Sequence, residues 1–279
     1  MLRFVTAPIA AGVVATAAAL AAPPPAPALA PGDQEQYQRF LHADTHRAFA
    51  VGPTGQYGWS AERDDTFSAV LGAVYNCNKA GKALCAAYAV DDTPTFRAYD
   101  ANVAASNAAL QRLRDVSLNA TYAGEANDYG ITPEPSIHRW NLPGETPASV
   151  PGARLILTRY VLAQLASPAP PVLIDVSNSW GSHSTLPGAI WMRGAGDDAG
   201  DKNAAVSGLF TALLATVAPD HNTPVVVFCE GRQFWGAYNA ALRAVAAGYV
   251  NVYWYRGGIE AWQAAGLPIV NSVVLAQLW

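Results

Sequence analysis

The sequence predicts an α/β protein in which a parallel β-sheet carries helices on both faces, preceded by a small α+β unit. Residues 150–279 alternate short β-branched runs with helical patterns, which is typical of strands connected through helices. Residues 225–228 are entirely apolar, as a central strand buried on both faces must be. The chain has 279 residues, 51% of them hydrophobic and 14% charged, so it can bury a large core and is not disordered throughout.

The first thirty residues have the composition of an export signal. Arg3 is followed by an apolar run, residues 9–22, that is too short for a bilayer core, which needs about 20 residues. A Pro/Ala stretch at 23–31 contains small-residue cleavage patterns. We therefore expect residues 1–30 to be a secretory signal peptide, and the mature protein to be periplasmic or secreted, with no membrane association after cleavage. A low-complexity tail and an uncleaved membrane anchor are the alternatives.

Residues 33–100 are expected to form the small α+β unit. Residues 48–51 and 57–60 are strand-like and flank a Gly-Pro-Thr-Gly turn, which predicts a β-hairpin. Residues 66–76 have apolar side chains at helical spacing, with Asp64 or Asp65 able to cap the helix. Residues 85–90 form a further apolar stretch. This pattern predicts two or three strands with one helix.

The three cysteines of the chain, Cys77, Cys85 and Cys229, are an odd number, so one should remain free. A unit of this size has a small core, and export to an oxidising compartment permits a disulfide. Cys77 and Cys85 flank a short polar loop, and we predict that they are bonded to each other. Two reduced, buried cysteines are the alternative. The predicted pairing leaves Cys229 free.

Residues 101–149 are expected to be a helical and linker segment. The stretch is Ala/Asn-rich and helical in pattern up to residue 118. Beyond that point it lacks periodicity, and four prolines interrupt any regular element. We expect the segment to pack on the surface of residues 150–279.

Residues 150–279 contain the strands and helices of the predicted parallel sheet. In chain order, we expect strands at 154–158, 171–176, 224–229 and 251–255, and helices at 204–218, 237–247 and 259–265. Cys229 thus lies where the central apolar strand ends. In open α/β sheets, binding sites lie beyond the carboxyl ends of the strands.

Cys229 is the candidate nucleophile. A thiol at the start of a short loop before a helix faces backbone N–H groups and the positive end of that helix, so we expect its thiolate to be favoured and an anion to be held beside it. Arg232 adds a positive charge to the loop. The expected substrate-binding residues in this loop are Glu230, Gly231, Arg232, Gln233, Phe234 and Trp235. A buried, inert thiol at a strand end is the alternative.

Other candidate residues are less specific. Arg256 follows the last strand of the alternation and either lines the same site or pairs with Glu260 on the surface. His138, His183 and His221 lack the spacing of metal ligands, so we expect no metal and no cofactor. The net charge of -4 gives no electrostatic footprint for nucleic acid.

Several motifs in residues 150–270 together look like those of a rhodanese domain. In order, they are VLIDV at 172–176, LPGAI at 186–190, the strand and loop of Cys229, GYVNVY at 248–253, GGIEAW at 257–262 and GLP at 266–268. More narrowly, residues 146–152, 235–243 and 254–258 resemble exported rhodanese-like proteins of the CXXCW group, which are associated with PQQ-dependent alcohol oxidation.

The resemblance implies a sulfurtransferase. Cys229 would take the outer sulfur of thiosulfate or a similar donor as a persulfide, and would deliver it to a thiophilic acceptor such as cyanide or a thiol. A periplasmic redox protein is a further partner that the resemblance suggests. Asp175 would be a structural anchor in the second shell of the site; a turn or helix cap is its alternative role.

Three differences from related patterns bear on the chemistry. The CXXCW group has a second cysteine where this chain has Phe234, so only single-cysteine chemistry remains. Ser184 and Thr185, with His183 before them, replace a Gly-His pair found in many rhodaneses. Trp235 stands where a cysteine-dependent phosphatase would need arginine, which argues against that enzyme class. The alternative function is a catalytically weak accessory or binding protein that keeps the rhodanese fold.

Overall fold

The computed structural model describes residues 27–139 and 144–279. The predicted signal peptide, residues 1–30, therefore lies almost entirely outside the described residues. Within the described part of the chain, none of the helices combines the length and the apolar character needed to cross a bilayer.

The N-terminal unit is an antiparallel sheet with helices. Its elements are η1 (Pro31–Asp33), α1 (Gln34–His42), β1 (Ala48–Val51), β2 (Tyr57–Ser60), α2 (Thr66–Gly81), β3 (Ala86–Val90) and β4 (Thr93–Pro94). The strand order is β2-β1-β3-β4. The predicted hairpin, third strand and helix are present, whereas α1 and β4 were not predicted. Helix α2 begins where expected because the Asp65 side chain accepts a hydrogen bond from the Ser68 N–H at 2.6 Å.

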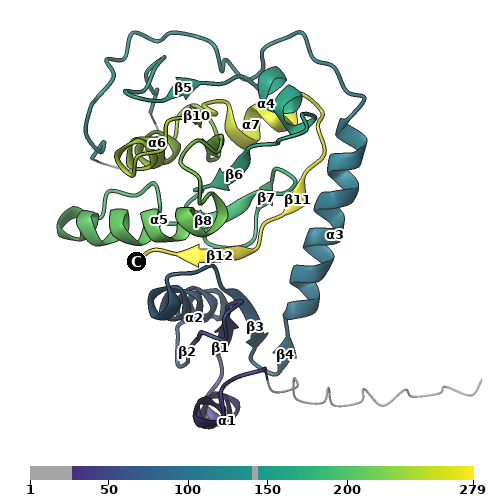
Figure 1. Cartoon of the computed structure of the whole chain (residues 1–279), viewed down its shortest axis with the longest axis vertical. Coiled ribbons are helices and arrows are strands. Elements are labelled where there is room, and N and C mark those ends of the chain that lie inside the picture. The colour runs from purple at the N-terminus through teal and green to yellow at the C-terminus, as the bar shows by residue number, and fades with distance from the viewer. Residues whose placement is uncertain (1–26, 140–143) are drawn as a thin grey trace, which may run out of the picture.

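Helix α3 (Phe96–Leu113) connects the two parts of the chain. It runs across residue 100 and packs along β11 (Val270–Asn271), as Figure 1 shows. It ends five residues before the predicted limit of 118. The described residues that follow, 114–139 and 144–149, lack helices and strands and pass over the far end of the molecule.

A six-stranded sheet forms the C-terminal part, and every neighbouring pair in it is parallel. The order β12-β8-β6-β9-β10-β5 places β9 inside the sheet. Its strands are β5 (Arg154–Leu155), β6 (Val172–Asp175), β8 (Ile190–Arg193), β9 (Val225–Phe228), β10 (Val252–Trp254) and β12 (Val274–Gln277). A separate antiparallel pair joins β7 (Ser184–Thr185) to β11.

Helices cover both faces of this sheet, as predicted. The helices are α4 (Thr158–Leu165), α5 (Asn203–Val217), α6 (Gly236–Ala246) and α7 (Gly258–Ala264), with a short η2 (Gly200–Lys202) before α5. One core holds side chains of α5 and α6, and the other holds side chains of α4 and α7. All four side chains of β9 are buried between these layers. The fold class predicted from the alternating pattern is therefore correct.

The first strand predicted in residues 150–279 is wrong at its end. The strand expected at 154–158 covers only Arg154–Leu155, and helix α4 starts at Thr158. The reason is that Val161 and Leu162 continue the apolar face at helical spacing and are buried against the sheet. Strands β7, β8, β11 and β12 were not predicted.

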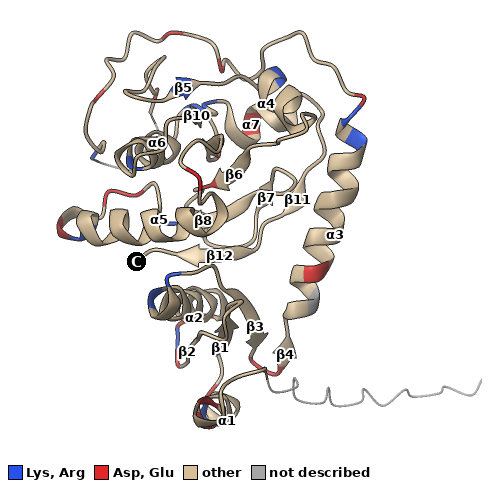
Figure 2. Ribbon diagram, in the orientation of Figure 1, with Lys and Arg blue, Asp and Glu red and all other residues tan. Residues whose placement is uncertain are grey.

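Charged side chains are few and mixed in sign. Figure 2 shows acidic and basic residues on both parts of the chain, mostly at element ends and in loops.

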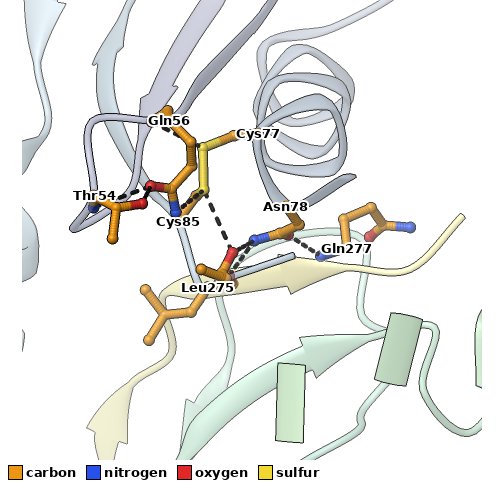
Figure 3. The surroundings of a disulfide bond; sticks show 8 residues. Thr54, Gln56, Cys77, Asn78, Cys85, Leu275 and Gln277 are labelled. Carbon is orange, nitrogen blue, oxygen red and sulfur yellow. Dashed lines mark hydrogen bonds between the residues drawn. A yellow bond between two sulfur atoms is a disulfide. The ribbon is translucent and has the colours of Figure 1, made fainter. Parts of the chain in front are cut away.

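The predicted disulfide between Cys77 and Cys85 is present and joins the end of α2 to the start of β3. Figure 3 shows that it lies where the N-terminal unit meets β12. The backbone N–H of Cys85 donates to the Leu275 carbonyl oxygen at 3.1 Å. The buried side chain of Asn78 donates to the same oxygen at 3.2 Å and accepts from the Gln277 N–H at 3.1 Å. The bridge thus supports the junction between the two sheets.

Removal of this disulfide should lower the free energy of unfolding. For the variant Cys77→Ala/Cys85→Ala we expect a loss of about 2 to 3 kcal/mol, because the unfolded chain regains the entropy that the short ring removes. Urea unfolding followed by circular dichroism measures it. Wild type unfolded with excess reductant is the matched control and should agree with the variant. A variant within about 0.5 kcal/mol of the oxidised wild type would contradict the prediction.

Candidate active site around Cys229

Cys229 begins the loop between β9 and α6. The first turn of α7 is hydrogen-bonded to this loop. The Ile259 N–H donates to the Cys229 carbonyl oxygen at 3.0 Å, and the Glu260 N–H donates to the Glu230 carbonyl oxygen at 2.9 Å. Gly258 makes this approach possible. Its φ is +56°, and a Cβ there would lie 2.2 Å from the Cys229 carbonyl oxygen. The conformation of the loop backbone is therefore held by helix α7 as well as by the loop's own sequence.

The thiol of Cys229 is buried, with 2% of the residue exposed. Its Sγ lies 3.5 Å from the carbonyl oxygen of Phe234. Burial raises the pKa of the thiol well above its ordinary value, and the negative charges of Glu230 and Asp175 raise it further. Hydrogen bonds from the backbone N–H groups of Ala237 and Gly231 lower it, but by less.

The predicted stabilisation of the thiolate is therefore wrong in its net direction. The expected backbone N–H groups are present at the sulfur. However, the loss of water around a charged sulfur outweighs them, because burial disfavours the thiolate and has the largest effect on the pKa of Cys229. The resting thiol is neutral at pH 7.

A cavity of about 180 Å³ lies beside the Cys229 loop. Cys229 itself is not part of its lining, but Phe234, whose carbonyl oxygen lies 3.5 Å from the sulfur, is. This volume corresponds to roughly six water molecules at about 30 Å³ each. Three of the predicted loop residues, Glu230, Phe234 and Trp235, contribute to its wall. The full lining is Val176, Asn178, Asp197, Glu230, Phe234, Trp235 and Gly236. Gly231, Arg232 and Gln233 lie in the loop but outside this lining.

Asp175 ends β6, the strand next to β9, and is fully buried. One carboxylate oxygen accepts from the Ser177 N–H at 2.9 Å. The other accepts from the Thr185 hydroxyl at 2.6 Å and is 2.8 Å from His183 Nε2. These contacts hold the two ends of the chain segment that carries Asn178, one of the cavity residues. Asp175 therefore organises the wall of the cavity from behind.

Comparison with known proteins finds one matching family. Residues 158–265 match the family model described as the rhodanese-like domain. These residues are similar to that family, and this region is called the rhodanese-like domain below. The parallel six-stranded sheet with helices on both faces is consistent with the rhodanese fold.

A solved structure similar to this chain is a thiosulfate sulfurtransferase from Pseudomonas aeruginosa, with 25% sequence identity and a TM-score of 0.32. The match covers 42% of this chain and 20% of that protein, so it spans about a fifth of the other chain. None of the curated proteins matches this chain.

Arg232 of the rhodanese-like domain does not face the cavity. Its guanidinium forms an ion pair with Glu145 and donates through Nε to the Ala123 carbonyl oxygen at 3.0 Å. It also lies over the Tyr129 ring, 4.8 Å from the centroid. Gln233 donates to the same Glu145 at 3.0 Å. Ala123, Tyr129 and Glu145 thus contact the outer side of the loop, and Glu145 neutralises the positive charge that the sequence suggested for the site.

Arg256 has neither of its two predicted roles. It is 1% exposed, so it does not pair with Glu260 at the surface, and it is absent from the cavity lining. Its Nε donates to the Thr146 hydroxyl at 2.9 Å, and its other nitrogens donate to the carbonyl oxygens of Thr146 and Asn127. Arg256 therefore fastens the segment after α3 to the rhodanese-like domain. Prediction from sequence missed this role because residues 127 and 146 lie far from 256 along the chain.

Trp235 closes the cavity on the side of the same segment. It is 6% exposed and stacks on the His138 ring with centroids 3.6 Å apart. The Asn239 side chain on α6 holds the His138 backbone, accepting from its N–H at 2.8 Å and donating to its carbonyl oxygen at 3.1 Å. The expectation that the segment packs on the surface of the domain is correct.

Sequence reasoning missed four residues of the cavity lining, Val176, Asn178, Asp197 and Gly236. Asn178 follows β6, so the rule that sites lie beyond strand ends was sufficient to find it. Asp197 follows β8, a strand that was not predicted, so nothing in the sequence indicated that Asp197 lies at this site. In the described residues, no group of three or more His, Cys, Asp or Glu side chains is arranged to hold a metal ion.

Proposed function

We propose that the rhodanese-like domain is a sulfurtransferase that carries sulfane sulfur as a persulfide on Cys229. One observation supports this proposal: a free cysteine follows the central strand, the N–H groups of Gly231 and Ala237 are directed at its sulfur, and its own loop lines a small cavity through Glu230 and Phe234. Such N–H groups stabilise negative charge on sulfur during transfer. The apolar N-terminal segment and the disulfide support a periplasmic location.

The reaction has two steps. Cys229 loses its proton, and the thiolate attacks the outer sulfur of thiosulfate or a similar donor. The S–S bond of the donor breaks, and the leaving group, sulfite in the case of thiosulfate, departs with the electron pair. A thiophilic acceptor, such as cyanide or a thiolate, then attacks the outer sulfur of the persulfide. Cys229 leaves as a thiolate and regains a proton. No external oxidant or reductant is needed.

A second candidate function is that of an accessory or binding protein with negligible turnover. The burial of the Cys229 thiol and the stacking of Trp235 on His138 favour it, because both limit access to the sulfur. In this role the protein would act with a periplasmic redox partner in PQQ-dependent alcohol oxidation, as the motif resemblance implies.

Mass spectrometry of the intact protein distinguishes the two functions. The mature chain is incubated with thiosulfate and, separately, with cysteine persulfide, and then desalted. A sulfurtransferase gains about 32 Da, one sulfur atom, on Cys229, and releases thiocyanate when cyanide is added. The variant Cys229→Ser is the control and should gain nothing. If wild type is indistinguishable from this variant with every donor, the sulfurtransferase proposal is wrong and the accessory role stands.

A further inference from the structure

The cavity beside the Cys229 loop has acidic walls. Glu230 and Asp197 both line it, and Asp175 lies behind it, close enough to raise the pKa of Glu230. Glu260 adds a fourth carboxylate at the loop, because a Cβ on Gly231 would lie 2.3 Å from Glu260 Oε2. A donor entering the cavity therefore meets negative charge on more than one side.

The arginines near the site compensate the negative charge of some of these carboxylates and not of others. Arg232 is paired with Glu145 on the outer side of the loop, and Arg256 is buried beneath the segment after α3. Arg243 lies beside Asp197: it donates to the Asp197 carbonyl oxygen at 2.8 Å. Burial lowers the pKa of Arg193 and of Arg243, and the negative charge of Asp197 opposes this shift in both. The negative charge of Asp197 is thus compensated by arginines of the protein itself.

Glu230 has a different environment. Burial is the main cause of its raised pKa. Backbone N–H groups, including that of Asn178, and the partly buried His183 lower this pKa. His183 is itself hydrogen-bonded to Asp175. Among the described residues, no arginine or lysine forms an ion pair with Glu230. Glu230 is therefore the carboxyl of the cavity wall whose charge a bound ligand would meet.

We propose that this cavity takes sulfur from a cationic aminothiol persulfide in preference to an anionic donor such as thiosulfate, and that Glu230 sets the preference. The inference rests on the proposed function, since it concerns the donor for the same Cys229. A small donor places its charge within a few ångströms of Glu230. At that distance, opposite and like charges near a protein surface change binding by about 10- to 100-fold in opposite directions.

The loading step is balanced with such a donor. The Cys229 thiol gives up its proton, and its sulfur attacks the outer sulfur of R–S–SH. The S–S bond of the donor breaks, R–S⁻ leaves with the electron pair and takes up a proton. The products are the Cys229 persulfide and R–SH, with no change in the total number of electrons.

A charge series tests the preference on the wild-type protein. The donors are the persulfides of 2-aminoethanethiol, 2-mercaptoethanol and mercaptoacetic acid, which share the reacting sulfur atoms and differ in the charge beside them; thiosulfate is the fourth donor. We expect loading rates in the order amine, alcohol, acid, with the amine at least about 10-fold faster than the acid and than thiosulfate. Added salt should compress this range.

The variant Glu230→Gln tests the residue. Its amine-to-acid ratio should fall toward one, mainly through faster loading by the acid and by thiosulfate. Glu35→Gln, an equal charge change on the exposed face of α1, is the matched control and should keep the wild-type ratio. Circular dichroism checks that both variants are folded, and the wild-type series stands without either variant.

Each outcome is decisive. If no donor loads Cys229, the proposed function and this inference fail together. If the protein loads sulfur but thiosulfate or the acid persulfide reacts as fast as the amine persulfide, the sulfurtransferase proposal stands and the inference is overturned. A folded Glu230→Gln protein with an unchanged ratio would overturn the assignment of the preference to Glu230.

Discussion

The rate at which Cys229 gains sulfur from thiosulfate should rise about tenfold for each pH unit between pH 7 and pH 9. Burial and the nearby Glu230 raise the pKa of the Cys229 thiol well above its ordinary value. Below that pKa, the thiolate fraction falls tenfold with each unit of decreasing pH, and the thiolate is the attacking species. Thiosulfate is the probe because its own charge does not change over this range. Intact-mass measurement of initial rates at constant ionic strength gives the profile.

The raised pKa of Cys229 also sets the highest pH at which this experiment can be done. The folded protein keeps a proton on Cys229 that the unfolded chain releases near the ordinary thiol pKa of about 8.5, so folding loses stability as the pH rises above this value. Rates are therefore compared only where circular dichroism is unchanged. A plateau below pH 8 would contradict the prediction, because it would mean that the N–H groups of Gly231 and Ala237 outweigh the burial of the sulfur.

Replacement of Arg256 by alanine should lower the free energy of unfolding by about 3 to 5 kcal/mol. The guanidinium is 1% exposed and donates to the Thr146 hydroxyl and to the carbonyl oxygens of Thr146 and Asn127. Its removal leaves these acceptors without their donor and also takes away the contact with the Tyr129 ring, 5.4 Å from the guanidinium carbon. The segment that binds the outer side of the Cys229 loop loses its anchor.

Arg154 offers a matched control on a neighbouring strand. Its guanidinium lies 4.6 Å from the Tyr253 ring centroid and donates to the Asn251 side chain, but at the surface. For Arg154→Ala we expect a loss below about 1 kcal/mol. Arg256→Lys should be intermediate, since lysine keeps the charge without the planar arrangement of donors. Urea unfolding measures all three variants. An Arg256→Ala protein as stable as Arg154→Ala would show that the buried contacts are not needed.

Local pattern was sufficient for most elements of this chain. The all-apolar stretch of β9, the cap of α2 by Asp65 and the short separation of Cys77 and Cys85 are properties of neighbouring residues, and each was predicted correctly. Strands β7 and β11 have two residues each, too few for a period to be seen. Strand β12 is recognisable only through its partner β8 and through Asn78, which is 199 positions away from Gln277.

The sequence by itself determined the α/β class, the disulfide and the position of a free cysteine at the end of the central strand. Tertiary structure decided the charge state of that site. Arg232 and Arg256 bind Glu145, Thr146 and Asn127, far from them in the chain, instead of the cavity. The pKa of Cys229 is set by how much water the fold removes, a quantity that depends on every element packed around the sulfur. Spacing along a chain reports local geometry, whereas burial and charge balance are sums over contacts that only folding creates.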